Sequence, residues 1–482
     1  MNLLGQLGRG AAWTYGGMAI SGGLQVFVVA ATARLFAPEV FGLMAMANVV
    51  LRFGNYFAQM GVGRALIQRA DIDDEDVRAA FTSTTLLGAL ATIAITAIAP
   101  LGAAYYQTES VVPVLRCLAW MFLISGLGAT SRALLQRRLL FRATSAIDVA
   151  SYAFGYAIPA LVLGANGFGV WSLVAGVLGQ TVVSTSASLL LTRHPLAPML
   201  RWGPHARLLR FGASVSGISV LEFLGSSLDT LVVGRFGTAA QLGLYNRAFM
   251  LASLPSHQAN QGIARVLFPV LSSGRSDPAA FSYALGVATT SAIRLVIPLG
   301  IGMGLAAPEI VRVVLGDSWI QAIPLFAILA PTLAIDVLGT FPGQALDAVG
   351  RLRWKAIVQA AYAALLGAFL VMASSGSLDL ERVTFIMAIA ISLRTVAHFA
   401  VAYGAGAMSS VVIRQATASL GLSLVLTIAL FTPLLALLRR AEASDELVLT
   451  AAILLGGCVL LCLFGKGVVT FLRHRRGSKV SN

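Results

Sequence analysis

Runs of apolar residues, each roughly 20 residues or longer and separated by short polar segments, recur along the whole chain. A helix of about 20 apolar residues crosses a hydrocarbon core of about 30 Å and satisfies its own backbone hydrogen bonds there. The pattern therefore predicts an all-α integral membrane protein with about fourteen transmembrane helices. The predicted spans are residues 11–33, 40–60, 79–106, 111–131, 143–166, 169–192, 211–233, 241–262, 281–308, 318–342, 356–376, 383–405, 415–438 and 446–465.

The composition agrees with this pattern and argues against a soluble catalytic domain. The 482 residues are 57% hydrophobic and only 11% charged, with a mean hydropathy of +0.84, whereas soluble proteins carry about 25% charged residues. Cys458 and Cys462 lie in an apolar span, where small apolar side chains explain their spacing better than a metal site. Gly465-Lys466-Gly467 lacks the other residues of a phosphate-binding loop. We therefore expect no catalytic residues, no metal site and no hydrolysis of ATP.

The net charge of +14 comes from basic residues that gather in alternate polar segments. If the N-terminus is cytoplasmic, the cytoplasmic segments hold 23 of the 34 Lys and Arg residues, and the external loops hold six. Membrane proteins keep such an excess of basic residues on the cytoplasmic side. The pattern predicts a multi-pass protein with both termini in the cytoplasm, and it argues against a surface for nucleic acid.

An internal repeat is visible when the chain is shifted by 201 residues against itself. Twelve positions in sixty are then identical, among them Arg34 with Arg235 and Gly42 with Gly243. Glycine and arginine matches at helix ends and loops carry weight, because backbone geometry and charge are constrained there. Transporters are commonly built from such repeats. We expect two pseudo-symmetric six-helix lobes, residues 1–200 and 201–408, followed by two additional helices and a basic cytoplasmic tail in residues 409–482.

Polar residues form a stripe on the predicted span 40–60. Spacings of 4, 3 and 4 residues place four of them on one helix face, namely Asn48, Arg52, Asn55 and Gln59. Such groups are costly to bury against lipid and usually face a cavity or a partner. The second lobe has Ser253, Ser256 and Asn260 at the positions that match Arg52, Asn55 and Gln59, and His257 lies beside Ser256. We therefore expect a central cavity that binds substrate through Arg52 first, and through Asn48, Asn55, Gln59, His257 and Asn260.

A second polar face is predicted in the span 211–233. Glu222, Ser226 and Asp229 are spaced by 4 and 3 residues and share one side of a helix. Two carboxylates in one membrane stripe suit a role in coupling or gating by a proton or cation. Each acid is equally well explained as the partner of a nearby arginine, such as Arg247. Both explanations stay open from the sequence, and so does coupling to protons or sodium ions.

Isolated charged residues occur in several other spans, and they differ in their expected depth in the membrane. Arg294 and Arg394 fall near the middle of their spans, where a long side chain does not easily reach the headgroups. We expect these two to bind substrate or to take part in gating. Arg116 and Arg247 lie near the external ends and can reach the headgroups. The remaining candidates are Asp148, Asp336 and His398.

Three segments resemble a known family. They are ARLFAPEVFGLMAMANVVLRFGNYFAQMGVGRALIQ (residues 33–68), LDTLVVGRFGTAAQLGLYNRAFMLASLP (residues 228–255) and RVLFPVLSS (residues 265–273). Their sequences resemble those of the Wzx-type polysaccharide translocases, most closely the exopolysaccharide branch, within the multidrug/oligosaccharidyl-lipid/polysaccharide exporter superfamily. Asp229 and Gly234-Arg235 match the sequence pattern of this family. The helix count and the repeat extend the resemblance over the whole chain.

This resemblance implies a flippase of the bacterial inner (plasma) membrane. Members of the family move lipid-diphosphate-linked oligosaccharide repeat units from the cytoplasmic to the periplasmic leaflet, by alternating access between two lobes. The implied partners are an undecaprenyl-diphosphate-type lipid-linked oligosaccharide, membrane lipids, and a polysaccharide polymerase with its export machinery. No cofactor is implied. Guanidinium groups suit a diphosphate, so Arg52 is the first candidate to bind it, followed by Arg294 and Arg394.

Two other functions remain as alternatives. A cation-coupled exporter of drugs or metabolites from the same superfamily would rely on acids such as Glu222 and Asp229. A membrane polysaccharide polymerase or ligase would be expected to carry a large periplasmic loop, and the predicted external loops are all short.

Overall fold

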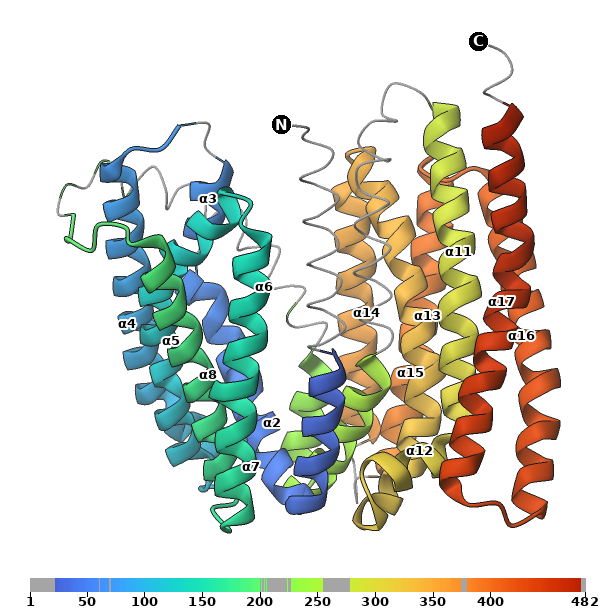
Figure 1. The fold of residues 1–482 in the computed structure, drawn as a ribbon, viewed down its shortest axis with the longest axis horizontal. Helices are drawn as coiled ribbons and strands as arrows, with labels where there is room; N and C mark the ends of the chain where they lie inside the picture. The colour runs from blue at the N-terminus through green and yellow to red at the C-terminus, as the bar shows by residue number, and fades with distance from the viewer. Residues whose placement is uncertain are drawn as a thin grey trace. The chain divides into compact units, whose positions relative to one another are not determined.

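The computed structural model describes residues 22–59, 61–68, 71–199, 227–254, 278–373 and 379–477, together with residues 201, 203, 205 and 223. In these residues all regular structure is helical, as the apolar pattern predicts (Figure 1). Contacts between Cα atoms divide the chain into two compact parts. We call Met1–Gly243 the N-terminal unit and Leu244–Asn482 the C-terminal unit.

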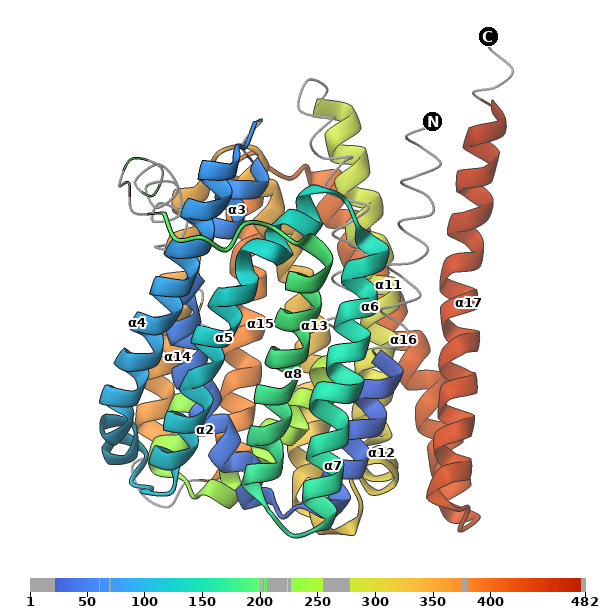
Figure 2. The same cartoon turned by 60° about the vertical axis from the view of Figure 1, so that its left-hand side comes forward.

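The N-terminal unit is a bundle of long helices joined by short turns. α4 (Asp74–Tyr106) packs against α5 (Val111–Arg137), and α5 packs against α8 (Val170–Thr192) (Figures 1 and 2). Glycine permits this closeness, because a Cβ atom at Gly126 would lie 2.5 Å from the carbonyl oxygen of Thr84. The other helical segments are Gly22–Leu35, α2 (Pro38–Gln59), α3 (Val62–Gln68), α6 (Phe141–Ala150), the π-helical η1 (Ser151–Ala157), α7 (Ile158–Ala165), and residues 227–236 and 239–243.

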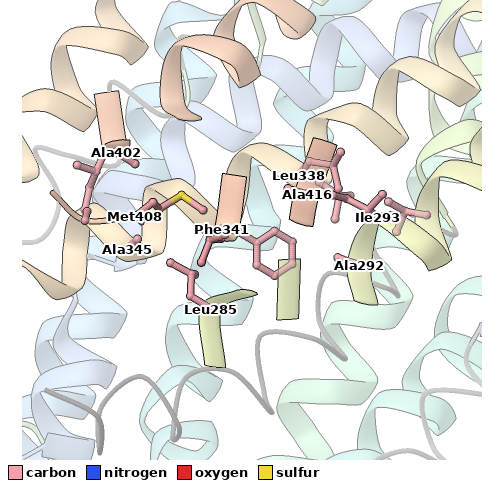
Figure 3. Packing of buried hydrophobic residues seen from close by; sticks show 14 of the residues in the cluster. Leu285, Ala292, Ile293, Leu338, Phe341, Ala345, Ala402, Met408 and Ala416 are labelled. Atoms are coloured by element: carbon pink, nitrogen blue, oxygen red, sulfur yellow. The ribbon is translucent and has the colours of Figure 1, made fainter. Parts of the chain in front are cut away.

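The C-terminal unit is built around α13 (Ile323–Ala348). Two helices pack against it, α11 (Pro278–Leu305) and α15 (Leu380–Gly404), and α16 (Ser410–Arg440) packs against α11. Leu285, Leu338 and Phe341 belong to their shared apolar core (Figure 3). The other helical segments are residues 244–254, α12 (Ala307–Val314), the 3₁₀ helix η3 (Asp317–Ala322), α14 (Leu352–Ala373) and α17 (Asp445–Gly477).

The two additional helices expected near the C-terminus are α16 and α17. Both pack against α11, and they pack against each other, with Phe431 and Val448 in one apolar cluster. They are therefore part of the compact C-terminal unit. The predicted lobe boundaries after residues 200 and 408 stay a prediction, because residues 206–222, which follow the first boundary, lie outside the described residues.

Eight helices among the described residues are long and apolar enough to cross a membrane. Each corresponds to one of the predicted spans, and on α4 the side chains of Leu90, Ile93 and Leu101 are exposed, as suits contact with hydrocarbon. The chain is therefore a multi-pass membrane protein. The total of about fourteen spans stays a prediction. The eight helices are Asp74–Tyr106, Val111–Arg137, Phe141–Ala165, Val170–Thr192, Phe281–Leu305, Asp317–Ala348, Leu380–Gly404 and Ser410–Arg440.

A reciprocal contact within the N-terminal unit follows the 201-residue repeat. A Cβ atom on Gly42 would collide with the carbonyl oxygen of Ala239, and a Cβ atom on Gly243 would collide with that of Pro38. Shifting Pro38 and Gly42 by 201 residues gives Ala239 and Gly243, so the same contact is made once by each copy. Only glycine lets the two backbones approach this closely. The repeat seen in the sequence thus has a structural counterpart.

Candidate functional site

The polar stripe predicted in residues 40–60 lies on α2. Asn48, Arg52 and Asn55 are all exposed. Gly54 is buried on another face, where a Cβ atom would lie 3.0 Å from the ring of Phe122 in α5. The helix therefore turns a guanidinium and two amides away from the core of its own bundle, as the spacing predicts. We call Asn48, Arg52 and Asn55 the α2 stripe.

The chemistry of the α2 stripe suits a ligand that is anionic and rich in hydroxyl groups. A guanidinium forms paired charge-assisted hydrogen bonds with phosphate oxygens. Asparagine amides both donate to and accept from hydroxyl groups. Phe53, next to Arg52, is exposed, and its ring centroid lies 5.4 Å from that of Phe223. The stripe thus places one cation and two amides beside an aromatic pair.

Four of the predicted site residues lie wholly or partly outside the described residues. They are Glu222, His257 and Asn260, and Gln59, whose backbone alone is described. Asp229 is described, and its side chain is buried in the N-terminal unit. The roles of these residues in substrate binding, coupling or gating stay predictions, as does the central cavity.

Arg394, a predicted substrate-binding or gating residue, contacts two neighbouring helices. Its guanidinium forms an ion pair with Asp336 of α13 and lies over the ring of Tyr362 of α14, 4.2 Å from the ring centroid. The carboxylate compensates the charge, and both contacts hold the guanidinium in place. In the sequence, Arg394 and Asp336 are separate candidates, since they are 58 positions apart and nothing local pairs them. The part played by Tyr362 was missed.

Arg294 occupies a different place in the C-terminal unit. Its Nη1 donates a hydrogen bond of 3.4 Å to the backbone oxygen of Leu463, so it links α11 to α17. Arg394 contacts α13 and α14 instead. In the contacts of the described residues, the two arginines are therefore not brought into one site.

A second set of polar groups, which the sequence pattern did not reveal as a set, runs along α13. Two aspartates and two glycines at spacings of 3, 4 and 4 share one helix face: Asp336, Gly339, Gly343 and Asp347. Lys355 of α14 reaches this face, with its Nζ 3.0 Å from Oδ2 of Asp347. We call the following residues the α13 charged stripe: Asp336, Asp347, Lys355, Arg394 and His398.

His398 approaches the same face of α13 from α15. A Cβ atom at Gly339 would lie 3.7 Å from Nδ1 of His398 and 3.2 Å from Oγ1 of Thr395, so the absence of a side chain at Gly339 leaves room for both. His398 is only 7% exposed. Neither of its ring nitrogens has a hydrogen-bond partner within the described residues. The sequence signal that could have pointed here is the aspartate and glycine spacing in residues 336–347, taken together with the histidine in the predicted span 383–405.

An apolar cavity of about 850 Å³ lies in the C-terminal unit, between α11, α13, α15 and α16. Its wall includes Ile293, Leu338 and Ala416, which also belong to the core in Figure 3. The polar groups in its wall are a few hydroxyls, such as that of Thr395. A cavity with this lining accommodates a hydrocarbon chain and offers little to a charged ligand.

Other ion pairs in the two units link neighbouring helices. Asp148, a further candidate from the sequence, pairs with Arg132 of α5. Arg439 of α16 forms an ion pair of 2.7 Å with the buried Glu309 of α12. Throughout the part of the chain that the structure describes, no group of three or more His, Cys, Asp or Glu side chains could hold a metal ion.

The fold of the chain is shared with a solved structure. It matches the structure of the lipid II flippase MurJ in an inward closed conformation, with a TM-score of 0.72, over 95% of this chain and 99% of that chain. The sequence identity is 13%, so this likeness concerns the fold. Residues 31–324 match the family described as polysaccharide biosynthesis protein, and the chain belongs to that family.

Relatives named as polysaccharide biosynthesis proteins agree with this family. The chain is 27% identical to the teichuronic acid biosynthesis protein TuaB of Bacillus subtilis over 307 residues, which cover 62% of this chain and 62% of TuaB. It is 24% identical to the lipopolysaccharide biosynthesis protein WzxC of Escherichia coli over 348 residues, which cover 71% of this chain and 70% of WzxC. The resemblance to Wzx-type proteins is thereby confirmed.

Proposed function

We propose that this protein is a flippase for lipid-diphosphate-linked oligosaccharide units in polysaccharide biosynthesis. Its family and relatives belong to polysaccharide biosynthesis, and its fold is that of a lipid II flippase. The observation that carries the proposal is the exposed α2 stripe, in which Arg52 lies between Asn48 and Asn55. A diphosphate needs a cation and a sugar needs hydrogen-bonding amides, and the stripe supplies both.

The lipid part of such a substrate needs a different environment. The apolar cavity among α11, α13, α15 and α16 supplies it, because a wall of aliphatic side chains suits an isoprenoid chain. Headgroup and lipid chemistry are thus available in the same protein. In the proposed cycle the two lobes open alternately to the two sides of the membrane, so that the headgroup crosses without contact with hydrocarbon.

The proposed location, topology and partners of the protein follow from the distribution of its basic residues and from its family. We place the protein in the bacterial inner membrane with both termini in the cytoplasm, because the basic residues gather in the segments on that side. The proposed substrate carrier is an undecaprenyl-diphosphate-type lipid, and the proposed partners are a polysaccharide polymerase and export machinery. Flipping breaks no covalent bond, so the protein is proposed to be a transporter without catalytic residues, driven by a proton or sodium gradient.

Reconstitution tests this proposal directly. The purified protein is placed in liposomes that contain a polyprenyl-diphosphate-linked N-acetylglucosamine, and the fraction of sugar accessible to an external enzyme is followed with time. We expect flipping several-fold faster than in protein-free liposomes, and no transport of the cationic dye ethidium, which Arg52 would repel. Export of ethidium without movement of the lipid-linked sugar would instead support the drug exporter and reject the proposal.

A further inference from the structure

Buried histidines in this protein differ in how their ring nitrogens are used. His194 and His205 are each 8% exposed, and both ring nitrogens of each take part in hydrogen bonds of 2.6 to 3.1 Å. His398 is equally buried, but neither of its nitrogens has a partner within the described residues. Buried polar atoms are nearly always paired in folded proteins, so an exception indicates a function or an exchange with water. His398 is such an exception inside a membrane-spanning helix.

Charged groups of both signs surround His398. Those close to it are Asp336 and Asp347 on α13, Lys355 on α14 and Arg394 on its own helix, α15. Tyr362 of α14 faces Arg394 and is a further titratable group of this region. Asp336 pairs with Arg394, and Asp347 pairs with Lys355. In the α13 charged stripe, His398 is thus the member that forms no ion pair.

The α13 charged stripe extends from the predicted cytoplasmic end of α13 toward the middle of that helix. Asp347 lies in the last turn of α13, just before the basic segment of residues 351–355, which the charge pattern places in the cytoplasm. Asp336 lies 11 residues earlier, which is about three helical turns deeper in the membrane. Between them, Gly339 and Gly343 leave the face of α13 open beside His398 and Lys355. Polar groups therefore follow one another from the predicted cytoplasmic end of α13 toward its middle.

We propose that His398 is a proton-binding site through which proton movement drives the conformational cycle of the protein. The inference rests on the proposed function, since it concerns the energy source of the proposed flippase. It assigns the coupling role to the C-terminal unit, whereas the sequence had suggested Glu222 and Asp229. The ligand of the site is a proton supplied by water.

The proposed step changes one charge and one ion pair. A hydronium ion transfers its proton to the nitrogen lone pair of the neutral imidazole: an N–H bond forms, an O–H bond of the hydronium breaks and leaves water, and the ring becomes a cation. His398 and Arg394 are four residues apart on α15, so the imidazolium then competes with the guanidinium for Asp336. This weakens the Asp336–Arg394 pair that joins α13 to α15, and release of the proton to the other side restores the pair. Gly339 leaves the ring space to approach α13.

A first experiment measures protonation without transport. The protein with isotope-labelled histidine is placed in lipid nanodiscs, and the imidazole signals are followed by NMR from pH 4 to pH 9. We expect one signal to titrate that is missing from His398→Gln, while His205→Gln removes a different signal and leaves that titration unchanged. If His398→Gln does not fold, His398→Asn provides the assignment. An imidazole of His398 that keeps one protonation state over the whole range overturns the proposal.

A second experiment measures coupling. Proteoliposomes that enclose a pH-sensitive dye are given the polyprenyl-diphosphate-linked N-acetylglucosamine on one side. We expect substrate-dependent proton movement in the wild type, a loss of at least tenfold in His398→Gln, and no change in His205→Gln. Wild-type coupling in His398→Gln overturns the proposal. If the wild type moves no lipid-linked sugar while His398 still titrates, the proposed function fails and the proton site stands, so the two failures can be told apart.

Discussion

The α2 stripe and the α13 charged stripe both place polar groups along one face of a long helix, yet they are built differently. The α2 stripe is exposed and comes from a single helix, with Arg52 between two amides. The α13 charged stripe draws on three helices, pairs acids with bases, and buries His398. An exposed set suits contact with a ligand, whereas a paired set suits the joining of helices and a change of pairing. One sequence pattern therefore occurs in two different surroundings, and substitutions can test whether the two stripes have different roles.

The largest expected effect concerns Arg52. Arg52→Ala should slow transport of the lipid-linked sugar between roughly tenfold and 100-fold, because a hydrogen bond to a charged group contributes about 1.5–3 kcal/mol. The transport rate of Arg52→Lys should lie between the rates of the wild type and Arg52→Ala, since lysine keeps the charge but loses the paired geometry. Flipping rates at equal protein level in liposomes measure the effect. Arg116→Ala removes another exposed arginine and should behave as wild type. Full activity of Arg52→Ala would remove the functional contrast between the stripes.

Asp336→Asn should instead lower the free energy of unfolding of the protein. It leaves Arg394, whose side chain is 15% exposed, without its carboxylate. Loss of one partner of a buried pair costs about 3–5 kcal/mol, and because the Asp336 side chain is 38% exposed we expect about 1–3 kcal/mol here. Unfolding in detergent, followed by circular dichroism, measures the change. Asp336→Asn/Arg394→Gln should recover part of the loss, and Arg52→Ala should stay within about 0.5 kcal/mol of the wild type. Equal stability of Asp336→Asn and wild type would contradict a structural role of the pair.

A smaller effect is expected at the amides of the α2 stripe. Asn48→Ala and Asn55→Ala should each slow transport by about twofold to tenfold, because a neutral hydrogen bond contributes about 0.5–1.5 kcal/mol. The same flipping assay measures this. Asn166→Ala changes an exposed asparagine at the end of α7 and serves as the control. If all three variants behave alike, the amides of α2 do not contact the sugar.

The smallest effect is expected for Lys355→Met. The side chains of Lys355 and Asp347 are 36% and 39% exposed, so their ion pair contributes only about 0.2–1 kcal/mol. A double-mutant cycle with Asp347→Asn, measured by unfolding at low and high salt, gives the coupling energy. We expect a coupling that falls as salt is raised. A coupling above about 3 kcal/mol would show that the pair is shielded from solvent in the membrane.

The sequence predicted features that depend on one helix at a time. Apolar length gave the eight confirmed spans, and the 4 and 3 spacing of Asn48, Arg52 and Asn55 predicted their common exposed face. The partners of Arg394 were missed because Asp336 and Tyr362 lie on other helices, and packing alone brings them together. Local spacing contains no information about which helices become neighbours.

The sequence also did not predict a local irregularity in one of the helices. The span predicted at residues 143–166 is interrupted by the π-helical turn η1. Within it, a Cβ atom at Gly155 would lie 2.5 Å from the Cα atom of Gln180 in α8. A widened turn that brings two backbones together depends on the neighbouring helix. The apolar pattern predicted the helix and could not predict its change of pitch.

The contact between Gly42 and Gly243 constrains how this gene can vary. Each glycine accommodates a carbonyl oxygen supplied by the other copy, so a side chain gained at either position collides with main chain that no rotamer change can move away. A second substitution at the partner position cannot relieve the collision, because it would add a side chain of its own. The two codons are therefore restricted independently, and a single missense change at either one is enough to disrupt the crossing.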